Sequence, residues 1–358
     1  ATVFRAPNSA TGEHVVEVSC HGGDLAPKMA LQSLLDHGAR MAEPGEFTER
    51  AFLNGKMDLA QAEAVADLID ATSTKAHQAS LTHLKGRYSD LLGDLREELL
   101  NLCSLVELEI DFSDEDVEFA DRERLEDLLD ETEEILGDLL DTYPTGEKLK
   151  DGVQVVIGGR PNAGKSTLLN ALVGHDRAIV SETPGTTRDE IEAEAEIEGV
   201  LFRFVDTAGL RDTADEIEAE GVRRATESIE EADVLFYLYD LTVGLDSQEI
   251  AFLQDLADDG SDVQPVVIGN KADRAPDLPV ATLDGLTSLK LSALEAREDA
   301  DEVQPLLDHL TDTVAEHLSR AEASPVVMNQ RHRQHLRDAL DAVQQAREAL
   351  DAGVSGDM

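Results

Sequence analysis

A glycine-rich segment near the middle of the chain has the residue types and spacing of a phosphate-binding loop. GGRPNAGKST (158–167) fits the pattern G-x-x-x-x-G-K-S/T through Gly159, Gly164, Lys165 and Ser166. Glycines let the backbone curl so that its N–H groups point at phosphate oxygens. In this pattern the lysine reaches the β- and γ-phosphates and the serine hydroxyl binds Mg²⁺. An apolar run precedes the segment and a helical pattern follows it, which favours a nucleotide site over a chance match.

Two later segments predict that the base is guanine. NKAD (270–273) follows an apolar run, and the carboxylate of Asp273 can accept two hydrogen bonds from the N1–H and N2–H₂ edge of guanine. Adenine lacks this pair of donors, so the motif selects GTP over ATP. Asn270 and Lys271 are expected to hold neighbouring loops and cover the base. SAL (292–294) fits a backbone contact to guanine O6.

Two segments between these motifs are expected to meet the γ-phosphate. DTAG (206–209) supplies Asp206 for the metal shell and the N–H of Gly209 for the phosphate. GTTRD (185–189) lies where the first switch of a GTPase belongs, and Thr187 is the natural second Mg²⁺ ligand. All these motifs in this order predict a GTPase.

Around the motifs, short apolar runs alternate with helical segments. The runs suited to parallel strands are 153–159, 201–206, 234–240, 265–270 and 288–293. The helical patterns are 165–173, about 217–231, 247–258 and about 302–318. EAEAEIEGVLFRFVD (192–206) predicts a hairpin that turns at Glu198-Gly199. Together they predict a doubly wound, Ras-like α/β domain over residues 149–318.

The flanking segments are helical from about Met57 to 142 and again over 319–358. Residues 56–148 and 319–358 are therefore expected to be two parts of one helical domain into which the GTPase domain is inserted. The first part is expected to break near 110–119 and to end at a connector, TYPTGEK (142–148). Residues 1–55 mix apolar runs with turns: 14–23 suggests a strand and 42–56 an irregular segment.

The net charge of −46 comes from 76 acidic and 30 basic residues. An acidic interaction surface would concentrate these charges, whereas here they are spread over every segment. Spread charge favours adaptation to a very salty cytoplasm, where a Debye length of about 3 Å at 1 M salt removes most self-repulsion. Such a protein should repel nucleic acid unless salt or a local basic patch offsets the charge.

Apolar stretches, cysteines and the first residue indicate the kind of protein to which the chain belongs. No stretch reaches 18 apolar residues, so we expect no transmembrane helix. Cys20 and Cys103 lack the spacing of a metal site, which favours reduced thiols in a cytoplasmic protein. The first residue is Ala1 rather than Met, which suggests that the chain begins inside a longer protein.

The motifs and their surroundings resemble one family. GRPNAGKS, IVSETPGTTRD and DTAGLRDT resemble GTPases that carry a hydrophobic residue where the catalytic glutamine usually lies. PNSATGEHVVEVSCHGG, AEPGEFTERAFLNGKMDLAQAEAVADLIDA and LVELEIDFSDEDVEF resemble the MnmE (TrmE) family of tRNA-modification GTPases outside its GTPase domain. These segments are the more specific signal, because related GTPases of ribosome assembly lack them.

The resemblance implies an architecture and partners. The family has an N-terminal folate-binding domain, here partial over residues 1–55, and a G domain inserted in a helical domain. Its members form homodimers and act with a flavin-dependent partner of the MnmG type. Together they modify C5 of the wobble uridine in tRNA with a carboxymethylaminomethyl-type group. A tetrahydrofolate, in the 5-formyl or methylene form, supplies the one-carbon unit.

The resemblance also implies how hydrolysis proceeds with Leu210 in the usual glutamine position. A bound K⁺ stabilises the developing negative charge where other GTPases use an arginine finger. The matching K⁺ ligands are Asn162, Ser181, Thr183 and Thr186. The attacking water is positioned by Glu218 through a bridging water; the residue pattern alone would make Glu218 a solvated helix residue.

The full set of implied site residues follows from the motifs and the family match. The catalytic residues are Glu218, Lys165 and Thr187, and the Mg²⁺ ligands are Ser166 and Thr187. The GTP contacts are Asn162, Ala163, Gly164, Lys165, Ser166, Thr167, Ser181, Thr186, Thr187, Asp206, Thr207, Ala208, Gly209, Asn270, Lys271, Asp273, Ser292, Ala293 and Leu294.

For folate, Glu17 and Lys56 match ligand positions of the family; read alone, they are a strand-face glutamate and a lysine at a helix start. Glu17 would bind the pterin-type ring and Lys56 a carboxylate. His21 has no partner at useful spacing and is expected to be structural. The family also has a further segment before Ala1, with another folate-binding arginine, and a C-terminal cysteine motif beyond GVSGDM (353–358).

Two other functions are alternatives to a tRNA-modification GTPase. A ribosome-assembly switch of the Era/Der type shares the GTPase motifs but predicts an RNA-binding module with a basic GXXG loop, which the sequence lacks. An inert helical scaffold conflicts with the intact nucleotide motifs. The basic residues Arg331, His332, Arg333 and Arg337 fit either an RNA contact or a solvated helix face.

Overall fold

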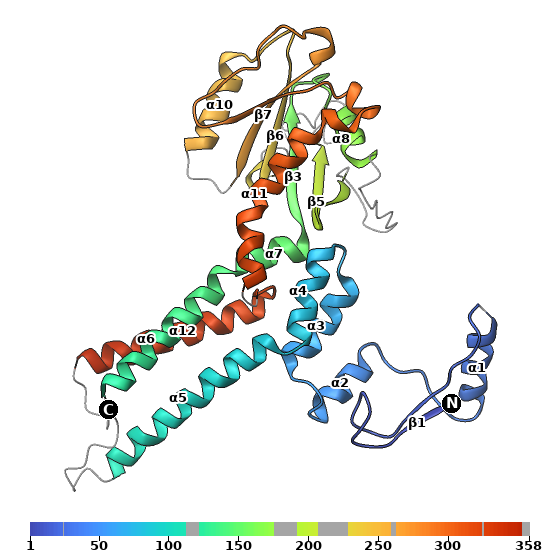
Figure 1. Cartoon of the computed structure of the whole chain (residues 1–358), viewed down its shortest axis with the longest axis vertical. Coiled ribbons are helices and arrows are strands. Elements are labelled where there is room, and N and C mark those ends of the chain that lie inside the picture. The colour runs from blue at the N-terminus through green and yellow to red at the C-terminus, as the bar shows by residue number, and fades with distance from the viewer. Residues whose placement is uncertain are drawn as a thin grey trace, which may run out of the picture. The chain divides into compact units, whose positions relative to one another are not determined.

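A computed structural model describes residues 1–23, 25–111, 122–174, 192–206, 228–258, 263–323 and 326–352 (Figure 1). The chain divides into two compact units. The first contains 1–71, 77–137 and 337–358, and the second contains 72–76 and 138–336. The second unit is interrupted in sequence by part of the first, and residues 337–358 return to the first unit after it.

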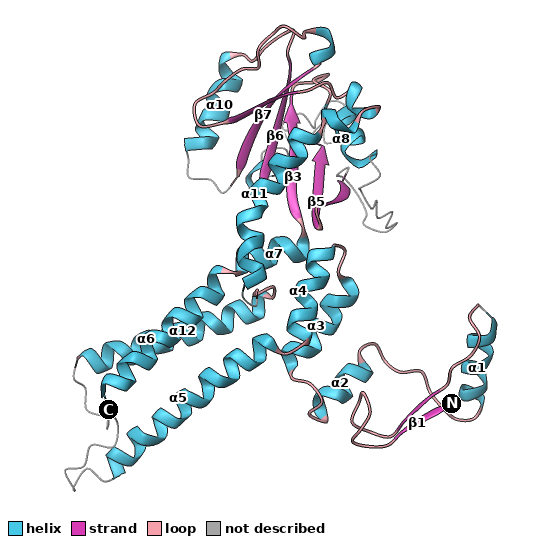
Figure 2. Cartoon of the chain, in the orientation of Figure 1, coloured by secondary structure: helices cyan, strands magenta, loops and turns pink. Residues whose placement is uncertain are grey.

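The second unit is built on one six-stranded sheet with the order β4-β5-β3-β6-β7-β8 (Figure 2). The strands are β3 (Val153–Gly159), β4 (Glu192–Ile197), β5 (Val200–Asp206), β6 (Val234–Asp240), β7 (Gln264–Asn270) and β8 (Thr287–Lys290). All neighbours pair in parallel except β4 and β5, which form the predicted hairpin. The strands that follow β3 in the chain lie on both sides of it, with β5 on one side and β6 on the other. Sheets of this kind bind ligands at the carboxyl ends of the strands where the order reverses in this way.

The central strands are apolar because both faces of the sheet are covered. Phe202, Phe204, Phe236 and Leu238 are fully buried, together with Ile157. The helices of this unit are α7 (Tyr143–Asp151), α8 (Lys165–Gly174), α10 (Ser247–Asp258) and α11 (Gln304–Ala323), with short 3₁₀ turns η3 (Ala272–Arg274), η4 (Glu295–Arg297) and η5 (Ala300–Glu302). Leu168 of α8 and Leu306 of α11 join the core on one face.

The first unit holds a small antiparallel sheet and helices. Its strands are β1 (Thr2–Phe4) and β2 (Val15–Glu17), and its leading helices are α1 (Leu25–Asp36), α2 (Glu46–Leu53), α3 (Leu59–Asp70) and α5 (Arg87–Asp111). Three helices run from one unit into the other: α4 (Thr74–Leu84), α6 (Arg122–Asp141) and α12 (Gln330–Asp351). No helix among the described residues is both long and apolar enough to cross a membrane.

The N-terminal end of α4 belongs to the second unit because it joins the β4–β5 hairpin. The backbone N–H of Lys75 donates to the carbonyl of Gly199 over 2.9 Å. The Glu196 carboxylate accepts from the N–H of Thr74, also over 2.9 Å. A carboxylate at a helix N-terminus satisfies a donor that has no partner within the helix.

Two segments predicted to be irregular are helical. TYPTGEK lies in α7 rather than in a connector: Pro144 is in the first turn, where a missing N–H costs nothing. Gly146 is required by close packing, since a Cβ there would lie 2.2 Å from the carbonyl oxygen of Val327. Similarly, α2 begins directly after the turn at Gly45, where φ is 77°. The predicted break near 110–119 falls largely on residues outside those described.

Candidate functional site

The glycines of the phosphate loop allow close backbone approach at the carboxyl end of β3. Gly159 has φ 131°, and a Cβ there would lie 2.1 Å from the carbonyl oxygen of Leu238. Gly164 has φ 105°, and its Cβ would lie 2.1 Å from Nδ2 of Asn270. Any side chain at either position would push the loop away from β6 or from the guanine motif.

The two charged groups expected at the phosphates lie within this loop. Lys165 is buried, and its Nζ donates to the carbonyls of Gly159 (2.9 Å) and Arg160 (3.0 Å). The hydroxyl of Ser166 donates to Oδ2 of Asp206 over 2.7 Å. Asp206 is buried at the end of β5, and Ser166 is in the first turn of α8, which follows β3, the parallel neighbour of β5. The fold therefore brings together a hydroxyl and a carboxylate, oxygen ligands that Mg²⁺ prefers.

Asn270 connects the phosphate loop with the guanine loops. Its Nδ2 donates to the carbonyl of Ala163 over 2.7 Å. Its Oδ1 accepts from the backbone N–H groups of Lys271 (2.7 Å) and Ala293 (2.9 Å). The side chain makes three hydrogen bonds and is 2% exposed, so it joins its own loop to Ala163 and to Ala293.

The residues expected around the base are also held in place. Asp273 accepts a hydrogen bond from the Ser292 hydroxyl over 2.9 Å, which orients its carboxylate. Ser292 and Ala293 are buried, whereas Leu294 is exposed. Lys271 has φ 66° and its Nζ lies 2.6 Å from Oδ2 of Asp240.

Asp240 was not singled out from the sequence. Burial raises the pKa of its carboxyl, but hydrogen bonds from Lys271 and Thr242 outweigh burial and lower the pKa to about 2. Asp240 therefore remains ionised opposite Lys271 at neutral pH. The sequence places Asp240 at the end of an apolar run, but only the pairing of β6 with β7 brings it beside the strand that carries Asn270.

Several predicted site residues lie outside the described part of the chain. These are Ser181, Thr183, Thr186 and Thr187 of the first switch, and Thr207, Ala208, Gly209, Leu210 and Glu218 after β5. Of the predicted K⁺ ligands, Asn162 alone is described; it has φ 62° and is exposed at the loop surface. Thr167, in the first turn of α8, is partly buried.

The predicted folate residues lie in the first unit. Glu17 ends β2 and is exposed, and Lys56 follows α2 and donates from Nζ to the carbonyl of Pro7 over 3.2 Å. No hydrogen bond or ion pair joins Glu17 to Lys56 in the described structure. His21 is exposed.

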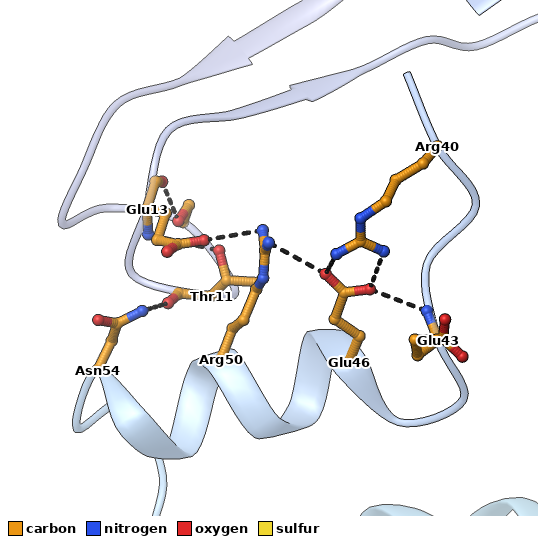
Figure 3. A network of polar contacts seen from close by, with 8 residues as sticks. Thr11, Glu13, Arg40, Glu43, Glu46, Arg50 and Asn54 are labelled. Atoms are coloured by element: carbon orange, nitrogen blue, oxygen red, sulfur yellow. Dashed lines mark hydrogen bonds and ion pairs between the residues drawn. The ribbon is translucent and has the colours of Figure 1, made fainter. Parts of the chain in front are cut away.

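A polar network orders the segment around α2 (Figure 3). Glu46 accepts two hydrogen bonds from Arg40 (2.8 and 2.6 Å) and one from the backbone N–H of Glu43 (2.8 Å). Arg50 bridges Glu46 (3.0 Å) and Glu13 (3.2 Å). The hydrogen bonds from Arg40, followed by that from Glu43, lower the pKa of the Glu46 carboxyl to about 2.

Comparison with known proteins identifies the family. The model described as GTP-binding protein TrmE N-terminus matches residues 1–56, and the MnmE helical domain model matches residues 59–358. The tRNA modification GTPase MnmE of Parabacteroides distasonis is 44% identical over 362 residues, covering 100% of this chain and 77% of its own length. This chain belongs to the MnmE family of tRNA modification GTPases.

Other relatives agree with the MnmE assignment. The Cytophaga hutchinsonii MnmE is also 44% identical, over 358 residues that cover 100% of this chain and 76% of the relative. Among solved structures, the GTPase Era of Aquifex aeolicus is 28% identical and covers 43% of this chain and 56% of its own, with a TM-score of 0.30. That likeness is too weak to carry an argument. The Ras-like G domain and the helical architecture predicted from the sequence are those of the MnmE family.

Proposed function

We propose that this chain binds GTP and Mg²⁺ between the phosphate loop and the NKAD and SAL loops, and hydrolyses GTP. The observation that carries the proposal is the triple hydrogen bonding of Asn270, which joins the phosphate loop to both guanine loops. A nucleotide placed across these loops would meet Lys165 at its phosphates and Asp273 at its base. The site is thus organised before the ligand arrives, which lowers the entropic cost of binding.

Within this proposal, Ser166 and Thr187 hold Mg²⁺, and Asp206 accepts the Ser166 hydroxyl or binds a water of the metal shell. The metal, when bound, neutralises charge on the β- and γ-phosphates. Lys165 changes partners from the carbonyls of Gly159 and Arg160 to phosphate oxygens. The exchange keeps a buried ammonium paired in both states.

For the hydrolytic step we propose that K⁺ binds to Asn162, Ser181, Thr183 and Thr186, and that Glu218 positions the water. The family match supports this assignment, as does the exposed position of Asn162 in the same loop as Lys165. The ion would supply positive charge near the transferred phosphoryl group. The Leu210 side chain is apolar and cannot take this role.

At the level of biology, we propose a cytoplasmic homodimer that modifies C5 of the wobble uridine in tRNA, with an MnmG-type flavoprotein and a tetrahydrofolate bound at Glu17 and Lys56. The match of the TrmE N-terminal model to residues 1–56 supports folate binding, and the full-chain similarity to tRNA modification GTPases supports the substrate. The domain boundaries 1–55, 56–148, 149–318 and 319–358 belong to the same proposal. The flanking matches weigh against a ribosome-assembly switch.

Base specificity tests the guanine site. Asp273→Asn should weaken discrimination among GTP, ATP and XTP, because the amide no longer accepts both guanine donors and can itself donate to xanthine. Competition binding with the three nucleotides measures this, with the exposed neighbour Asp277→Asn as the matched control. An unchanged preference for GTP in the Asp273 variant would sink the guanine-site assignment.

The water-positioning role is tested separately. Glu218→Ala should slow hydrolysis by about 10²-fold or more, as loss of a catalytic positioning group does, and should leave GTP affinity intact. Single-turnover hydrolysis and GTP binding are measured on the same preparation, with Glu220→Ala as control. A rate equal to that of the unmodified chain would remove Glu218 from the mechanism.

A further inference from the structure

Arg160, the residue after the first loop glycine, has no role in the nucleotide contacts proposed above. Its side chain leaves the loop and reaches the start of α10. Nη2 of Arg160 lies 2.6 Å from Oδ2 of Asp246 and also donates to Oε2 of Glu249. One guanidinium therefore joins the phosphate loop to two carboxylates of a helix that is 89 residues distant in sequence.

Those two carboxylates form the capping box of α10. Oδ1 of Asp246 accepts from the backbone N–H groups of Gln248 (2.8 Å) and Glu249 (2.9 Å). In return, Oε2 of Glu249 accepts from the N–H of Asp246 over 2.8 Å. A reciprocal cap of this kind fixes both side chains relative to the helix backbone. Arg160 consequently binds a rigid pair of acceptors rather than two mobile surface side chains.

The Glu249 carboxylate accepts a hydrogen bond from a third donor as well. The Tyr237 hydroxyl, from β6, donates to Oε1 of Glu249 over 2.9 Å. The side chain of Glu249 is only 9% exposed, and a carboxylate at that depth is tolerated only when its oxygens are hydrogen-bonded. Burial and the Glu249 carboxylate raise the pKa of Tyr237, so the phenol keeps its proton. We call Arg160, Tyr237, Asp246 and Glu249 the Arg160 cluster.

The backbone of Arg160 belongs to the working part of the loop. Its carbonyl accepts from Nζ of Lys165 over 3.0 Å and from the N–H of Ala163 over 3.2 Å. Pro161 follows it, and Asn162 comes next with φ 62°. A proline restricts the residue before it, so a shift of Arg160 passes to Asn162 without being absorbed by local rotation.

We propose that Arg160 is a positioning residue, which holds the phosphate loop against the capped start of α10 and so sets the placement of Lys165 and Asn162. The inference rests on the proposed use of these two residues in GTP binding and hydrolysis. Arg160 itself does not touch the nucleotide in this account; it acts through Glu249 and Asp246.

The test compares Arg160→Ala, Glu249→Gln and the double variant with the unmodified chain. The affinity for Mg²⁺–GDP is measured by titration calorimetry and expressed per folded molecule. We expect Arg160→Ala to weaken GDP binding about tenfold or more, since small displacements of a binding loop have effects of that size. Arg160→Lys, which retains one charged donor, should recover part of the loss.

The double variant shows whether Arg160 acts through α10. If it does, adding Glu249→Gln to Arg160→Ala produces no further loss of GDP affinity, because the connection is already broken. Fully additive losses would overturn the proposal. So would GDP affinity within twofold of the unmodified chain for Arg160→Ala.

Arg203→Ala is the matched control, because Arg203 pairs with Glu194 over 3.2 Å in the same sheet but outside the loop. It should leave GDP affinity unchanged, and an equal loss in this variant would contradict a specific role for Arg160. The K⁺ concentration that gives half-maximal hydrolysis should also rise in Arg160→Ala. A chain whose hydrolysis ignores K⁺ refutes the K⁺ proposal alone, since the GDP measurement still decides the role of Arg160.

Discussion

The sheet of the second unit and residues 1–56 are stabilised by different interactions. In the sheet, Phe202, Phe204 and Phe236 are fully buried, and the nucleotide loops extend from strands that carry this core. In residues 1–56, Val3 is 65% exposed and Leu53 is 71% exposed. A two-stranded sheet buries little apolar surface, so order there depends on polar contacts such as those of Glu46.

Because they are stabilised differently, the two regions should respond differently to solution conditions. The sheet that carries the nucleotide loops rests on apolar burial, which does not depend on the ionisation of a side chain. The segment that carries Lys56 rests on charge-assisted hydrogen bonds at the surface, which salt weakens. Acid should therefore disturb the polar network around α2 before it disturbs the sheet.

A cavity in the sheet should destabilise the protein most strongly. Phe236→Ala should reduce the free energy of unfolding of the second unit by about 3–5 kcal/mol, because a fully buried ring is lost from β6. Denaturant unfolding followed by far-UV circular dichroism measures the change. Phe47→Ala, at a ring 62% exposed on α2, should change the free energy of unfolding of the first unit by less than about 0.5 kcal/mol. Equal effects of the two substitutions would remove the contrast between the regions.

An intermediate effect is expected from acid. The pKa of Glu46 is about 2, below its ordinary 4.5, so its contribution to order is complete above pH 4.5 and is lost as pH falls towards 2. Glu46→Gln should remove this dependence and speed amide hydrogen exchange around α2 at neutral pH. NMR titration of the Glu46 carboxyl in the unmodified chain measures its pKa. A midpoint near 4.5 would show that the Arg40 contact does not hold in solution.

The smallest effect concerns Asp240. Asp240→Asn should weaken GDP binding by about threefold, because the contact with Lys271 is partly exposed and such pairs contribute less than about 1 kcal/mol. Calorimetric titration with GDP is sensitive enough to detect this. Asp246 is unsuitable as a comparison because it belongs to the Arg160 cluster, so Asp277→Asn serves as control. A loss above thirtyfold would indicate that Asp240 does more than hold Lys271.

Local pattern was sufficient to predict the nucleotide domain. The strand before the phosphate loop, the loop glycines and the NKAD strand each carry their signal within a few residues, and the parallel sheet follows from their order. The hairpin at Glu198-Gly199 was predicted for the same reason: an apolar alternation is interrupted by a turn pair.

The errors and omissions have a common physical origin. Pro144 and Gly146 indicated a connector, but one occupies the first helical turn and the other meets Val327, 181 residues later. Lys271 with Asp240 and Arg160 with Glu249 are pairs made by the fold, with no periodicity that links their positions. The helix over 247–258 was predicted, yet nothing in that pattern indicated that an arginine of the phosphate loop would bind at its start.

We propose that K⁺ takes part in GTP hydrolysis because Leu210 occupies the position of the usual catalytic glutamine. The most direct test is the GTP hydrolysis rate in KCl against NaCl, at matched and high ionic strength because the chain carries a net charge of −46. Our account predicts strong stimulation by K⁺ that is lost in Asn162→Ala. Equal rates in the two salts would contradict it and would point to a partner protein as the source of the catalytic group.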